Sequence, residues 1–158
     1  MTVHFIGAGP GAADLLTLRA VRLLQESPIC LYAGTYIDDE VLSHCGPETE
    51  LIDTAYLNLD AITATLVAAH DAGHDVARLC SGDPSIYSAI AEQTRRLDAA
   101  GVPWDLTPGV PAYAATAALI GRELTVPEVA QSVVLTRAQK DSTKMPQGET
   151  LAAFAATN

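Results

Sequence analysis

The chain has 158 residues, 49% of them hydrophobic, which suffices for one sizeable core or for one domain and part of a second. Its 9 basic and 19 acidic side chains give a net charge of −10, so it lacks the dense cationic surface that nucleic-acid binding needs. No apolar run reaches the roughly 18 residues of a membrane span, and no basic stretch precedes the short N-terminal apolar run, so we expect neither a membrane helix nor a signal peptide.

The first predicted elements are a strand at 3–6 and a helix at 14–24, with a glycine-rich turn between them. Asp14 is expected to cap this helix or to lie in its first turn. The apolar face of the helix is expected to contain Leu15, Leu18, Val21 and Leu23 or Leu24. Gly7, Gly9 and Gly11 leave backbone N–H groups uncovered at a helix start, which suits a small polar ligand, although an ordinary strand–helix turn would use the same residues.

Strands and helices alternate through the rest of the first 120 residues. Strands are predicted at 29–33, 51–54, 75–80 and 104–107, and helices at 38–44, 59–72, 84–100 and 112–120. This alternation predicts an α/β domain with a mainly parallel sheet and flanking helices. The loops at 7–13, 81–84 and 108–111 all follow strands and carry glycine or proline, so we expect them to meet at the carboxyl edge of the sheet and form a site.

The last quarter of the chain is expected to begin a second domain. A linker is predicted at 121–131, then a strand at 132–136, a polar loop at 138–148 and a helix from Glu149. One strand and one helix cannot form a core alone. The expected organisation is therefore an α/β domain at 1–120, the linker, and the start of an incomplete second α/β domain at 132–158.

Cysteine and histidine spacing gives little support for a metal site. Cys30, Cys45 and Cys80 form no CxxC pair and are interpreted as reduced core thiols, which favours the cytoplasm. His70 and His74 have i, i+4 spacing, but Gly73 intervenes and no third ligand is near, so a solvent-facing helix end is the better interpretation and no metal is predicted.

Two long patterns resemble those of the tetrapyrrole methylase family. The first runs from Ile6 to Ala20 (IGAGPGAADLLTLRA), and the second comprises Val76, Leu79, Gly82-Asp83, Tyr87-Ser88 and Leu106-x-Pro108-Gly109. Both occur in the family's order and spacing, and the resemblance covers the whole chain. It implies a methyltransferase that takes its methyl group from S-adenosylmethionine, acts on a tetrapyrrole, and forms a homodimer whose subunits hold a folded cofactor between two α/β domains.

Residues 123–137 and 145–151 are similar to one branch of that family, which implies a cobalamin-pathway enzyme that methylates C11 of the macrocycle. Two positions depart from family patterns. Ala12 stands where an acidic residue commonly follows Gly-Pro-Gly. Ala33 stands where uroporphyrinogen methylases carry an aspartate, which argues against that branch and leaves the proton acceptor unnamed.

The resemblance also implies a set of cofactor contacts. Pro10 would lie at the cofactor's edge, Ile86 would pack against it, and Ser81, Gly82 and Asp83 would contact it through backbone and carboxylate. Pro111 and Ala112 would border the adenosine.

Further roles are hypotheses from the residues themselves. Methyl transfer needs an electron-rich carbon aligned with the S–CH3 bond and a polar group near the acceptor, for which Asp83 and Tyr36 are the candidate catalytic residues. Tyr36 and Tyr113 are expected to line the substrate cleft, and Arg137 to bind a substrate carboxylate. Each has a plainer alternative: Asp83 as a helix cap, the tyrosines as packing residues, and Arg137 as a solvated surface charge.

Three other functions remain open at this point. One is methylation of a different tetrapyrrole, and another is a non-catalytic fragment, because the second domain is short. The third is a dinucleotide-binding oxidoreductase. It is disfavoured because Ala12 replaces the last glycine of the dinucleotide pattern, Pro10 removes a donor, and no acid is clearly placed about 20 residues further on.

Overall fold

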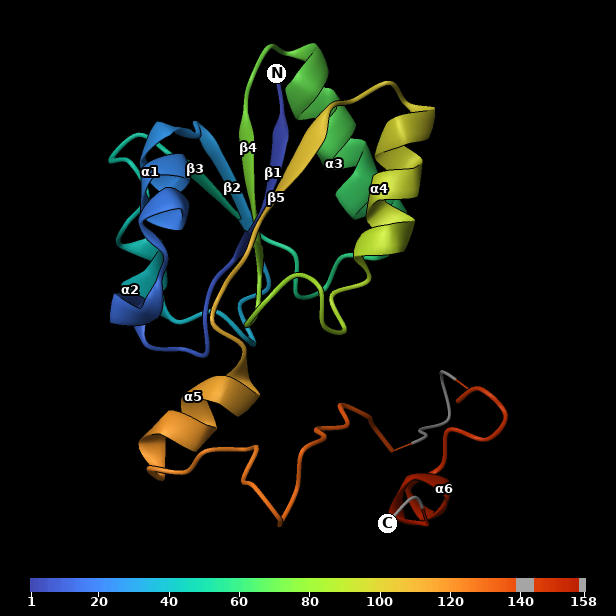
Figure 1. Cartoon of the computed structure of the whole chain (residues 1–158). Helices are drawn as coiled ribbons and strands as arrows, with labels where there is room; N and C mark the ends of the chain where they lie inside the picture. Colours follow the sequence, from blue (N-terminus) through green and yellow to red (C-terminus); the bar gives the residue numbers. More distant parts are fainter. Residues whose placement is uncertain (139–143, 157–158) are drawn as a thin grey trace. The chain divides into compact units, whose positions relative to one another are not determined.

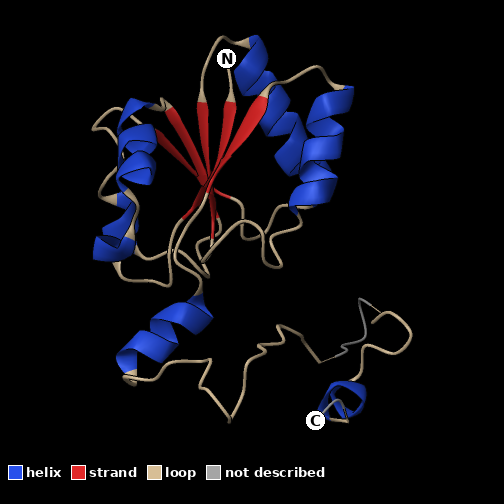
Figure 2. Ribbon diagram, in the orientation of Figure 1, coloured by secondary structure: helices blue, strands red, loops and turns tan. Residues whose placement is uncertain are grey.

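The computed structural model describes residues 1–138 and 144–156. They divide into two compact units, Met1–Thr116 and Ala117–Asn158. The first unit contains a five-stranded sheet with helices on both faces (Figure 1). Its strands are β1 (Val3–Gly7), β2 (Ile29–Tyr32), β3 (Glu50–Asp53), β4 (Val76–Cys80) and β5 (Trp104–Thr107). All pairings are parallel, in the order β3-β2-β4-β1-β5, so the predicted α/β fold with a parallel sheet is confirmed (Figure 2).

Each face of the sheet has its own hydrophobic core. Helices α1 (Leu18–Glu26) and α2 (Asp39–Leu42) cover one face, and α3 (Leu59–Asp71) and α4 (Ile90–Ala99) cover the other. Successive strand residues point to opposite faces, so Ala77 and Leu79 of β4 join the first core while Val76 and Cys80 join the second. Because β4 is covered on both sides, its side chains are all buried.

The strand order creates a switch point beside β4. From β1 and β2 the chain turns to the helices on one face, whereas from β4 it turns to α4 on the other. Neighbouring strands whose connections leave in opposite directions open a crevice at their carboxyl ends, and ligands of open α/β sheets bind there. The fold therefore places a candidate site at the carboxyl ends of β1, β2 and β4.

The first helix differs from its prediction. Residues 13–15 form a 3-10 turn, η1 (Ala13–Leu15), and α1 begins only at Leu18, because the Thr17 side chain accepts a hydrogen bond from the Ala20 N–H at 3.1 Å and so caps it. Asp14 lies in η1 and does not cap α1. The later start rotates the apolar face: Leu18 is 91% exposed, and the buried residues are Ala20, Leu23 and Leu24.

The predicted helix at 84–100 is also too long, because α4 begins at Ile90. Tyr87 and Ala89 adopt left-handed backbone conformations, with φ of 55° and 52°, which a right-handed helix cannot include. Residues 84–89 therefore form a loop above the carboxyl end of β4. Asp83 caps no helix, and its carboxylate has other partners, described below.

The remaining helices are α5 (Ala112–Leu119) and α6 (Leu151–Ala155), the latter capped by Thr150. The predicted strand at 132–136 is wrong, since these residues pair with no strand in the described part of the chain. A strand needs a partner for its backbone groups, and Val133, Val134 and Leu135 are about half exposed. Residues 139–143 of the predicted polar loop lie outside the described residues. No described helix is long and apolar enough to cross a membrane.

Candidate functional site at the carboxyl edge of the sheet

Three glycines bring the loops after β1, β4 and β5 into direct backbone contact. A Cβ on Gly109 would lie 2.2 Å from the Gly82 carbonyl oxygen, and one on Gly7 would lie 2.4 Å from the Gly109 nitrogen. Gly9 and Gly82 also pair: the Gly9 N–H donates to the Gly82 oxygen at 3.1 Å, and the Gly82 N–H donates to the Gly9 oxygen at 2.8 Å. The predicted convergence of the three loops is therefore confirmed, and it requires glycine because no side chain fits the crossing.

Asp83 joins two of these loops. Its Oδ2 accepts a hydrogen bond from the Gly109 N–H at 2.9 Å, and its Oδ1 accepts from the Ser85 N–H at 2.9 Å and from the Ser85 hydroxyl. Partial burial would raise the pKa of Asp83, but the hydrogen bonds from Ser85 and Gly109 outweigh it, so the pKa lies below its usual value. Asp83 is therefore ionised, and it holds the two loops together by accepting hydrogen bonds through both oxygens.

Asp53 is a second carboxylate at the same edge of the sheet that links two loops. Its Oδ1 accepts from the N–H of Gly34, in the loop after β2, at 2.9 Å and from the Ala55 N–H at 2.8 Å. These two backbone hydrogen bonds, Gly34 first, lower the pKa of the Asp53 carboxyl. Asp53, the last residue of β3, thus holds the loop after β2, as Asp83 holds the loop after β5.

The structure brings together most of the residues expected to contact the cofactor. Pro10 follows Gly9, which pairs with Gly82. A Cβ on Gly82 would lie 3.7 Å from the Pro111 Cα and 3.8 Å from the Ala112 nitrogen, ordinary van der Waals distances. Pro10, Gly82, Asp83, Pro111 and Ala112 therefore gather at the ends of β1, β4 and β5.

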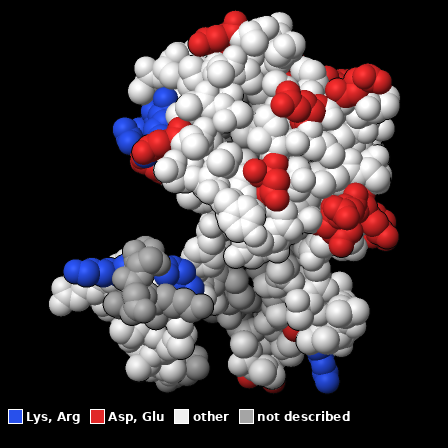
Figure 3. All heavy atoms as spheres, turned by 180° about the vertical axis from the view of Figure 1, so that it is seen from behind, with Lys and Arg blue, Asp and Glu red and all other residues white. Residues whose placement is uncertain are grey.

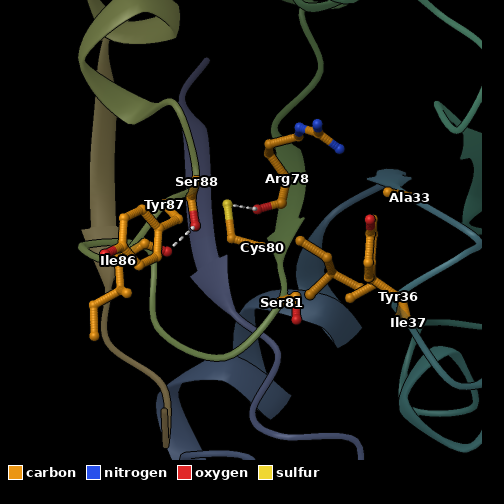
Figure 4. A pocket seen from close by; sticks show the side chains of 10 residues that line it. Ala33, Tyr36, Ile37, Arg78, Cys80, Ser81, Ile86, Tyr87 and Ser88 are labelled. Atoms are coloured by element: carbon orange, nitrogen blue, oxygen red, sulfur yellow. Dashed lines mark hydrogen bonds between the residues drawn. The ribbon is translucent and has the colours of Figure 1, made fainter. Parts of the chain in front are cut away.

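A cavity of about 370 Å³ lies next to this cluster, between the loops after β2 and β4 (Figure 4). The expected residues Tyr36, Ser81 and Ile86 are among those that line it. Tyr36 is 72% exposed and Tyr87 63% exposed, and Figure 4 shows them on opposite sides of Cys80. The lining residues are Ala33, Tyr36, Ile37, Arg78, Leu79, Cys80, Ser81, Ile86, Tyr87 and Ser88.

Sequence reasoning gave no place in the site to several lining residues, among them Arg78, Cys80 and Tyr87. A charged residue inside the apolar run 76–80 was a signal for Arg78, while Tyr87 was hidden by the helix predicted over it. Cys80 supplies no nucleophile here, because burial raises the pKa of its thiol to about 11 and keeps it protonated at neutral pH.

Three other residues singled out from the sequence lie elsewhere. Tyr113 is in α5, 42% exposed, and is not among the residues that line this cavity. Arg137 belongs to the second unit, where it lines a cavity of about 200 Å³ with Met145 and Glu149. His70 lies with its Nδ1 2.7 Å from the Met1 carbonyl oxygen.

Comparison with known proteins shows which family the chain belongs to. Residues 2–158 match the model of the tetrapyrrole (corrin/porphyrin) methylases. A precorrin-4 C(11)-methyltransferase of Rhodococcus erythropolis is 61% identical over 151 residues, which is 96% of this chain and 61% of that protein. A cobalt-precorrin-4 C(11)-methyltransferase of Methanocaldococcus jannaschii is 38% identical over 94% of this chain and 57% of its own length. The chain thus spans about three fifths of the length of these relatives.

Solved structures show the same fold. A cobalt precorrin-4 methyltransferase of cobalamin biosynthesis superposes with a TM-score of 0.92 at 36% identity, over 98% of this chain and 64% of that one. A uroporphyrin-III C-methyl transferase from Thermus thermophilus, complexed with S-adenyl homocysteine, superposes with a TM-score of 0.71 at 34% identity. The match covers 84% of this chain and 53% of that one. On the family match, the relatives and the shared fold, the chain belongs to the tetrapyrrole (corrin/porphyrin) methylase family.

Proposed function

We propose that this chain is part or all of an S-adenosylmethionine-dependent methyltransferase of cobalamin biosynthesis that methylates precorrin-4 at C11. The observation that carries the proposal is the 61% identity, across 96% of the chain, to a protein named for that reaction. Identity falls to 38% for the relative named for cobalt-precorrin-4, which supports the metal-free substrate.

The residues at the sheet edge fit S-adenosylmethionine. Gly9, Gly11 and Gly82 adopt positive φ values and carry no side chain, so a ligand can approach the backbone of these loops closely, and Pro10, Ser81, Ile86, Pro111 and Ala112 are proposed as its contacts. When bound, the cofactor supplies an electrophilic methyl group on a sulfonium. The protein's own contribution is to orient that group toward a carbon nucleophile, which rigid, glycine-packed loops do well.

Asp83 acts in this scheme as a positioning residue. A general base is most effective when its pKa lies near the working pH, whereas hydrogen bonds keep the pKa of Asp83 low. Its two oxygens also already accept hydrogen bonds from Ser85 and Gly109. We therefore assign it to holding the loops of the cofactor site, and Tyr36 remains the candidate polar group near the acceptor.

The tetrapyrrole is assigned to the cavity and to the surface around it. A volume of about 370 Å³ is small for a whole macrocycle, so one edge or side-chain arm enters while the ring lies against exposed aromatic surface. Tyr36 lines the cavity, and Tyr113 and Arg137 are proposed as further substrate contacts. The family resemblance supports a homodimer, and the free cysteines support a cytoplasmic location.

The test is transfer of a labelled methyl group. The protein is incubated with precorrin-4 and S-adenosylmethionine carrying a 13C methyl group, and the product is examined by mass spectrometry and by NMR. We expect one labelled methyl group, at C11, with cobalt-precorrin-4 as the comparison substrate. Transfer to another carbon or only to the cobalt complex would overturn the substrate assignment, and binding of NADH in place of S-adenosylhomocysteine would overturn the cofactor assignment.

A further inference from the structure

Arg78 is a buried guanidinium at the wall of the cavity. It lies in the central strand β4 and is only 8% exposed. Its Nη1 donates to the Thr54 hydroxyl at 3.1 Å, and its Nε donates to the Gln93 side-chain oxygen at 3.4 Å. Both partners are neutral, and a guanidinium has five N–H donors, so these two contacts do not exhaust its capacity.

No carboxylate neutralises this charge within the described residues. Acidic side chains are abundant on the surface (Figure 3), and the exposed Arg22 and Arg95 form ion pairs with Glu26 and Glu92. Arg78 forms no ion pair with any residue that the structure describes. An unpaired buried charge is destabilising, and here burial lowers the pKa of Arg78 more than the nearby thiols of Cys80 and Cys30 raise it. A buried cation with this energetic cost is expected to have a function, and binding of an anionic ligand would compensate the charge.

The cavity supplies a place for the missing anion. Arg78 lines it together with Tyr36, Ser81 and Ser88, so the lining contains polar as well as apolar residues. In Figure 4 the guanidinium lies on the same side of Cys80 as Ala33 and Tyr36. Arginine suits a carboxylate better than lysine does, because its planar fork offers two parallel donors.

We propose that Arg78 binds a carboxylate of the ligand that occupies this cavity. The inference rests on the proposed function, which offers two sources of a carboxylate: the amino-acid end of S-adenosylmethionine and the acidic side chains of the tetrapyrrole. In either case Arg78 selects for an acidic ligand and fixes it relative to the cofactor loop at 81–83.

The test compares Arg78→Gln with Arg95→Gln, which removes an exposed cation outside the cavity. Calorimetry measures the affinities for S-adenosylhomocysteine and for methylthioadenosine, which lacks the amino-acid end. Fluorescence measures the affinity for uroporphyrin III, which carries eight carboxylates. If the carboxylate belongs to the cofactor, Arg78→Gln weakens the binding of S-adenosylhomocysteine about tenfold or more and leaves the binding of methylthioadenosine unchanged. If the carboxylate belongs to the tetrapyrrole, only the binding of uroporphyrin III is weakened by that factor. Arg95→Gln leaves all three affinities within about twofold.

A second measurement keeps the test independent of how well Arg78→Gln folds. In wild-type protein labelled with 15N-arginine, the Arg78 Nε–H signal is expected to shift on addition of whichever acidic ligand it binds, while the Arg95 signal stays in place. Ligand binding that leaves the Arg78 signal and the affinities of a folded Arg78→Gln unchanged would overturn this inference and leave the proposed function standing. Failure of the wild type to bind any of the ligands would overturn both.

Discussion

Gly109 shows how a single residue sets the geometry of the site. The loops after β1, β4 and β5 approach so closely at Gly7, Gly82 and Gly109 that a methyl group at position 109 would lie 2.2 Å from the Gly82 oxygen. The atoms in the way are backbone, so relief requires the loops themselves to separate. Glycine here is a packing requirement.

Gly109→Ala is therefore expected to destabilise the protein by about 2 kcal/mol or more and to weaken S-adenosylhomocysteine binding. Gly73→Ala is the matched control, since its Cβ meets nothing within 4 Å and only its positive φ of 84° is unfavourable. It should cost about 1 kcal/mol and leave binding unchanged. Urea unfolding and calorimetry measure both, and equal effects of the two variants would contradict the packing argument.

Asp83 gives a pH-dependent prediction. Its pKa is lower in the folded protein than in the unfolded chain, so the unfolded chain takes up more protons as the pH falls and the contribution of Asp83 to stability is lost on acidification. At pH 7 Asp83→Asn should cost about 1–3 kcal/mol, because one amide N–H group then faces a backbone N–H. The difference from wild type should shrink as the pH falls below about 4.

The measurement is urea unfolding of wild type and Asp83→Asn between pH 7 and pH 3. Asp71→Asn, at the exposed end of α3, removes the same charge and should change stability by less than about 0.5 kcal/mol. A difference between wild type and Asp83→Asn that stays constant across this range would show that ionisation of Asp83 does not stabilise the fold.

At the residue scale the sequence predicted the convergence of the glycine loops, but it did not place Arg78 or Tyr87 at the cavity. Glycine-rich turns after strands are legible because few other residues permit them. Arg78 is different, since its proposed role rests on the lack of a carboxylate partner among the residues that the structure describes. That absence depends on tertiary contacts with Thr54 and Gln93, which the chain order does not reveal.

At the scale of elements, the loop at 84–89 marks the limit of pattern reasoning. Pro84 suits a first helical turn, and the apolar spacing continues into α4, so a helix was the natural prediction. Tyr87 and Ala89 instead adopt left-handed conformations, and the loop turns Ile86, Tyr87 and Ser88 toward the cavity. Here the backbone conformation required at the cavity overrides the local preference for a helix. Pattern-based predictions are expected to fail most often at such sites.

Ala89→Gly should relieve the strain stored at this turn. Ala89 has a φ of 52° as the residue before α4, so glycine is expected to stabilise the protein by about 1 kcal/mol. Ala64→Gly, at an exposed position inside α3, should destabilise it by about the same amount. Thermal and urea unfolding give both values, and destabilisation by Ala89→Gly would contradict the assignment of strain.

At the scale of the whole molecule, the alternation of strands and helices predicted the fold class, whereas the strand order came only from the structure. Placement of β4 between β2 and β1 creates the switch point and thus joins loops that are far apart in sequence. Local patterns do not encode that order. The strand predicted at 132–136 failed for the same reason, since a strand exists only with a neighbour. The boundaries of the expected second domain remain a proposal.

The most direct test of the central claim is amide mapping of cofactor binding. A 15N-labelled sample of the 16.5 kDa chain is titrated with S-adenosylhomocysteine, and backbone shifts are followed by NMR. The account predicts saturable changes concentrated at residues 7–13, 81–88 and 108–112, with NADH producing none of them. Saturable changes confined to other parts of the chain, or a folded chain that shows no change at any ligand concentration, would contradict a cofactor site at the carboxyl edge of this sheet.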